Sequence, residues 1–79
     1  IRTAEAQAKK LAAAGNVDAS KLIFDILDYS ETRPLNERAA YVYSSMSTML
    51  QQYPQLRSTI VPIMNSAKQD LQKQQAMEE

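Results

Sequence analysis

The chain has 79 residues, which is enough for one small domain and no more. It contains no histidine and no cysteine, so it lacks the commonest general base, the thiolate nucleophile and the usual zinc ligands. Nine basic residues balance nine acidic ones, and this zero net charge argues against nucleic-acid and membrane-surface binding.

The residue usage is typical of a helical protein. One glycine and three prolines supply few turns, whereas a β protein needs frequent turn residues between its strands. Alanine, leucine, lysine and glutamine, which favour helices, are plentiful. We therefore expect an all-α fold, a small three- or four-helix antiparallel bundle whose last helix is kinked at Pro62.

The first expected helix covers residues 3–14, with Thr3 as its N-cap. Gly15 stands where a left-handed residue commonly ends a helix. One face of this helix is almost entirely alanine, so it buries little area but allows close approach of a neighbour; its members are Ala4, Ala8, Leu11 and Ala12. Because large apolar groups are so few, a frayed N-terminal segment is the alternative.

The second expected helix begins near Asn16 or Asp18 and ends near Tyr29. Its apolar face covers roughly 220° of the circumference, far more than the ~100° stripe of an ordinary surface helix. The residues of this face are Leu22, Ile23, Phe24, Ile26, Leu27 and Tyr29. Such a helix is either sandwiched between neighbours or incompletely covered by its own chain.

The third expected helix follows a loop over residues 30–36, with Thr32 or Asn36 as its cap, and runs to about Gln52. Apolar residues recur along it every three or four positions and predict one buried stripe. The members of this stripe are Ala39, Val42, Tyr43, Met46, Met49, Leu50 and Tyr53.

The fourth expected helix begins at Pro54 or Gln55, because proline is favoured in a first helical turn. Its apolar stripe keeps its phase across Pro62, which favours one kinked helix over a short turn followed by a separate helix. The stripe consists of Leu56, Ile60, Ile63, Met64, Ala67 and Leu71. Residues 72–79 are rich in Gln, Lys and Glu and are expected to form a frayed tail.

No arrangement of polar residues predicts catalysis or metal binding. Asp25 and Asp28 could share a helical face, but two carboxylates without further ligands are weak evidence for a metal ion. The serine and threonine hydroxyls have no histidine to activate them, and the single Gly15 cannot form a phosphate-binding loop. We expect no enzyme activity, no cofactor, no metal and no small-molecule substrate.

Three apolar residues suggest a contact surface. Tyr41 and Val61 fall outside the buried stripes of their helices, and Phe24 marks the far edge of the wide second face. Together with Ile23 and Leu27 they are the predicted partner-binding residues. The natural mode for such a surface is docking of a helix or peptide.

We therefore expect residues 1–79 to form a single protein–protein interaction or self-association domain. A start at Ile1 rather than Met suggests a piece of a longer protein. A purely structural spacer is the main alternative, and nucleic-acid binding through Lys21, Arg33 and Arg38 is a weaker one. Neither a signal peptide nor a membrane-spanning run is visible, and the compartment is left open.

Overall fold

The computed structural model describes the backbone of residues 2–78 and the side chains of residues 3–73. The described part is helical, which confirms the expected all-α bundle, and it contains four α-helices. These are α1 (Arg2–Ala13), α2 (Val17–Glu31), α3 (Leu35–Gln52) and α4 (Arg57–Glu78), with a 3-10 turn, η1 (Pro54–Leu56), before α4.

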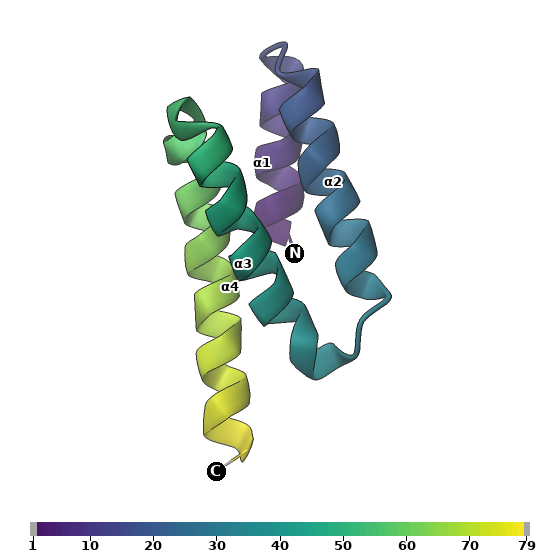
Figure 1. Cartoon of the computed structure of the whole chain (residues 1–79), viewed down its shortest axis with the longest axis vertical. Helices are drawn as coiled ribbons and strands as arrows, with labels where there is room; N and C mark the ends of the chain where they lie inside the picture. The colour runs from purple at the N-terminus through teal and green to yellow at the C-terminus, as the bar shows by residue number, and fades with distance from the viewer. Residues whose placement is uncertain (1, 79) are drawn as a thin grey trace.

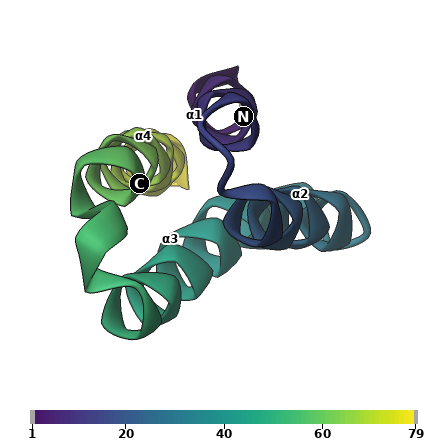
Figure 2. The same cartoon turned by 90° about the horizontal axis from the view of Figure 1, so that it is seen from above.

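The helices form a ring of antiparallel neighbours. α1 pairs with α2 and α3 with α4, and the α2–α3 and α1–α4 contacts join the two hairpins (Figures 1 and 2). We call the end that carries the α1–α2 and α3–α4 turns the closed end. The opposite end, which carries the α2–α3 connection, is the open end. α1 lies toward the closed end only, whereas α4 continues past the open end (Figure 1).

The turn between α1 and α2 is built on a left-handed glycine, as predicted. Gly15 has a φ of +92°, and its N–H donates to the Ala12 carbonyl at 3.1 Å. The Asn16 N–H donates to the Leu11 carbonyl at 2.8 Å, which completes a Schellman motif. Two details of the prediction were wrong: the helix already includes Thr3 instead of being capped by it, and Ala12 is exposed.

The carboxyl end of α2 extends past Tyr29, so Ser30 was wrongly placed in a loop. The Ser30 hydroxyl is buried and donates to the Leu27 carbonyl at 2.7 Å. Arg38 of α3 reaches back, and its Nε and one terminal nitrogen donate to the carbonyls of Arg33 and Glu31, each at 3.0 Å. Arg38 thus satisfies the carbonyl of Glu31, the last residue of α2, which has no N–H donor within its own helix.

Pro34, instead of Thr32 or Asn36, occupies the N-cap of α3. Its backbone is extended, with φ −54° and ψ 147°, and its carbonyl accepts the Glu37 N–H at 2.9 Å. The helix therefore begins at the next residue. At the other end Tyr53 leaves the helical region, with φ −127° and ψ 67°, as expected for a residue before proline.

The core follows the predicted stripes. The largest fully buried apolar side chains are Ile23, Met46, Met49, Ile60 and Ile63. α4 continues through Pro62 as one kinked helix. The backbone of α4 is helical to Glu78, so residues 72–78, predicted as a frayed tail, continue the helix. Glu79 and the side chains of residues 74–79 lie outside the described residues. No helix in the described part is long and apolar enough to cross a membrane.

Candidate docking groove at the open end

The five residues predicted to bind a partner are not gathered on one face. Ile23 is fully buried and Leu27 is 5% exposed, so both belong to the core. Phe24, Tyr41 and Val61 are half-buried. The wide apolar face of α2 is thus mostly covered by its own chain, because α2 is packed between α1 and α3.

The three half-buried residues lie at different edges of the bundle. The Tyr41 ring packs against the Tyr29 ring, with centroids 5.0 Å apart, and this pair marks the α2–α3 edge. Phe24 precedes Tyr29 by five positions, which places it about 140° away around α2. Val61 is on α4, about 180° around that helix from Asp70, nine positions later. Phe24 therefore faces away from the Tyr29–Tyr41 edge and Val61 faces away from Asp70, and binding of a partner by these residues stays a prediction.

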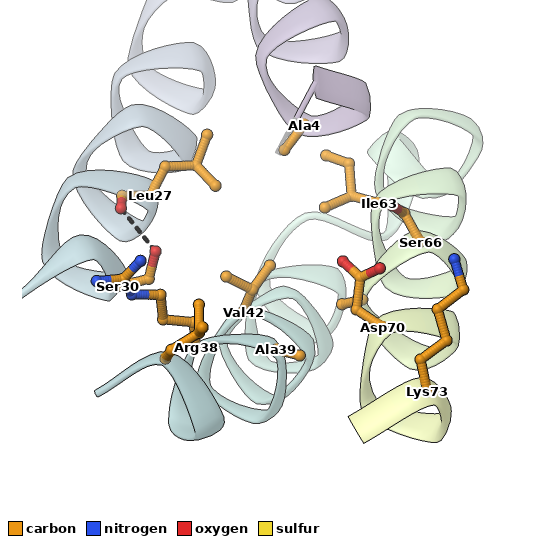
Figure 3. Close-up of a pocket in the computed structure, with 12 residues that line it drawn as sticks. Ala4, Leu27, Ser30, Arg38, Ala39, Val42, Ile63, Ser66, Asp70 and Lys73 are labelled. Atoms are coloured by element: carbon orange, nitrogen blue, oxygen red, sulfur yellow. Dashed lines mark hydrogen bonds between the residues drawn. The ribbon is translucent and has the colours of Figure 1, made fainter. Parts of the chain in front are cut away.

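A groove of about 300 Å³ lies instead at the open end, where α2, α3 and α4 continue beyond the start of α1 (Figure 3). Its walls come from all four helices. The apolar wall residues are Ala4, Leu27, Ala39, Val42, Ile63 and Ala67. Leu27 is thus the only one of the five predicted partner-binding residues that lines this groove.

The groove exists because the side chains around it are small. Ala39 and Ala67 occupy stripe positions on α3 and α4, and both are buried. Ser30 and Ser66 line the same space, and Ala4 closes it toward α1 (Figure 3). At the closed end the corresponding stripes carry Met49 and Ile60. The periodicity is therefore the same at both ends, and residue size makes the difference.

The mouth of the groove combines charged groups with one exposed apolar side chain. Arg38 lies on the α3 side, and Asp70 and Lys73 lie on the α4 side (Figure 3). Leu35, the first residue of α3, also lines the groove and is 70% exposed. The mouth is thus amphipathic, which suits a partner that has both apolar and charged groups.

Arg38 is held in place but is not neutralised. Both of its described hydrogen bonds go to backbone carbonyls, and no carboxylate lies within ion-pair distance of it among the described side chains. The nearby Arg33 differs, because it pairs with Glu37 at 2.8 Å. That hydrogen bond and the charge of Glu37 raise the pKa of the Arg33 guanidinium.

The polar groups around the groove are partly engaged within the fold. The Ser30 hydroxyl donates its hydrogen to the Leu27 carbonyl. Within the described residues no three acidic side chains cluster as a metal site would require. Comparison with protein families, curated proteins and solved structures gives no match to this chain.

The sequence pattern did not reveal the groove. Arg38, Ser66, Asp70 and Lys73 all fall outside the apolar stripes, so nothing in the periodicity places them around one cavity. The available signal was the size of the residues on the stripes. Alanine at positions 39 and 67 predicts thin packing where two helices face each other.

Proposed function

We propose that this domain is a non-enzymatic protein-interaction module that binds an amphipathic helix in the groove. One observation carries the proposal: a groove of about 300 Å³ at the open end is lined by apolar side chains from all four helices and is bordered by the exposed Leu35. A bound helix would cover the apolar wall residues that otherwise line this open groove.

The wall residues suit a helix as the occupant. Packed helices approach to about 8–10 Å between their axes, and the closest approaches need small side chains at the contact. Ala39 and Ala67 provide such positions, while Leu35 offers an exposed apolar contact at the mouth. The proposal keeps the helix-docking hypothesis from the sequence but moves the docking site from Phe24 to the groove lined by Leu27.

The proposal is tested by selecting, from a displayed library of randomised 14-residue helices, those that bind the domain. Two variants of the domain, each with one added carboxylate, then locate the binding site. Val17 and Leu35 are both exposed apolar residues at the first position of a helix. Leu35→Glu and Val17→Glu therefore introduce a carboxylate in matched places, where it interacts favourably with the positive end of the helix dipole. Leu35 lines the groove and Val17 lies at the opposite end of the bundle. We expect selected helices to lose at least tenfold in affinity for Leu35→Glu, consistent with a lost interface contact of more than about 1 kcal/mol, and to bind Val17→Glu normally.

Two results would overturn the proposal. If the library yields no binder, the domain is better explained as a structural spacer. If the selected helices bind both variants equally, their site is elsewhere. Light scattering of the unmodified domain over a concentration series would identify a second copy as the occupant, and Leu35→Glu should then abolish the dimer.

A further inference from the structure

We propose that the helix bound in the groove carries a basic residue, lysine or arginine, beside its apolar face, and that this residue pairs with Asp70. This inference rests on the proposed function. It adds the charge by which the groove selects among amphipathic helices.

The Asp70 carboxylate points toward the cavity. Asp70 follows Ala67 by three positions and Ile63 by seven on α4, so its side chain borders the apolar wall that these two residues form. Figure 3 shows its carboxylate turned toward the groove, whereas Lys73, one turn later, points its ammonium group away from the cavity. Asp70 is also the one carboxylate among the residues that line the groove. The α4 wall therefore presents a negative charge to an occupant.

No described side chain forms an ion pair with this carboxylate. The ion pair in the described part of the chain joins Arg33 and Glu37. Arg38 lies on the α3 side of the groove, and its guanidinium donates to the carbonyls of Glu31 and Arg33 (Figure 3). Asp70 is exposed in the free domain, so water solvates its charge.

A bound helix would change the surroundings of Asp70. The apolar wall attracts an apolar helix face, but a helix that covers the wall also removes water from the carboxylate beside it. A desolvated carboxylate without a partner is costly, whereas a lysine or arginine beside it restores a charge-assisted hydrogen bond. The groove should therefore disfavour helices that are wholly apolar on the bound side and favour those with a basic residue there.

The test uses the helices selected from the library, together with matched peptides in which the basic residue is replaced by Gln. We expect the selected helices to share a lysine or arginine next to their apolar face. Asp70→Asn removes the charge but keeps the shape of an exposed side chain, so it leaves the core intact. Asp25→Asn makes the same change at an exposed position of α2 that does not line the groove.

We expect Asp70→Asn to weaken binding of the basic helices about fivefold and binding of their Gln counterparts less than about twofold. Asp25→Asn should change either affinity by less than about twofold. Selected helices that lack a basic residue, basic helices that bind Asp70→Asn as tightly as the unmodified domain, or an equal loss for Asp25→Asn would overturn this inference while leaving helix binding intact. Failure of the library to give any binder would overturn the proposed function itself.

Discussion

The closed and open ends of the bundle are built from the same apolar periodicity but pack differently. At the closed end, Met49 and Ile60 fill the space between the helices and are almost completely buried. At the open end, Ala39 and Ala67 hold equivalent stripe positions and leave a groove of about 300 Å³. The comparison shows that periodicity decides which face turns inward, whereas side-chain volume decides whether the interior closes.

Removing volume from the closed end should have the largest effect. Ile60 is fully buried, and Ile60→Ala should lower the free energy of unfolding by about 2–5 kcal/mol, through lost burial and the cavity that remains. For a domain of this size that loss approaches the total stability. Urea denaturation followed by circular dichroism measures it. A change below about 1 kcal/mol would mean that the closed end is not tightly packed.

Adding side-chain volume should change the free energy of unfolding in opposite directions at the two ends. Ala8 is fully buried in α1, so Ala8→Leu should overpack the closed end and cost about 1–3 kcal/mol of unfolding free energy. Ala67→Leu adds the same atoms beside the groove, where there is room for them. We expect no loss there and a gain of up to about 2 kcal/mol, because leucine adds three carbons and each one that is buried contributes about 0.8 kcal/mol.

The same denaturation series checks this pair, and Ala67→Leu should also weaken binding of the selected helices by occupying their place. Equal destabilisation by the two substitutions would contradict the comparison, because it would show that both ends are closed.

The smallest expected effect concerns the connection at the open end. Arg38→Ala removes two hydrogen bonds to backbone carbonyls, those of Glu31 and Arg33, and should cost about 0.5–1.5 kcal/mol. Arg33→Ala is the matched control, because it removes a neighbouring guanidinium whose described ion pair is a solvent-exposed one with Glu37. We expect its effect to be the smaller of the two. If the order is reversed, Arg38 is not the residue that stabilises the end of α2.

Much of the fold could be predicted from the sequence, because local signals decided it. The φ of Gly15, the break at Tyr53–Pro54 and the stripe that keeps its phase through Pro62 all follow from backbone chemistry or period. The end of α2 was placed too early because the carbonyls there are satisfied from α3, by Arg38. A contact between two helices is not visible in the pattern of either one.

The candidate site could be predicted only in part, for the same reason. The wide face of α2 correctly indicated a helix that needs neighbours on several sides, but α1 and α3 supply most of that cover. Leu27 is where the predicted surface and the groove coincide. Asp70 and Lys73 line the same groove as Leu27 because α4 lies across from α2 in the ring (Figure 2). That position depends on how all four helices are arranged.

Arg38 has a consequence that extends beyond the groove. The same guanidinium lines the mouth and bonds to the backbone of the segment that joins the two hairpins. If a bound helix contacts Arg38, occupancy of the groove and rigidity of this connection become thermodynamically linked: the factor by which a rigid connection raises the affinity for the helix equals the factor by which the bound helix stabilises the connection.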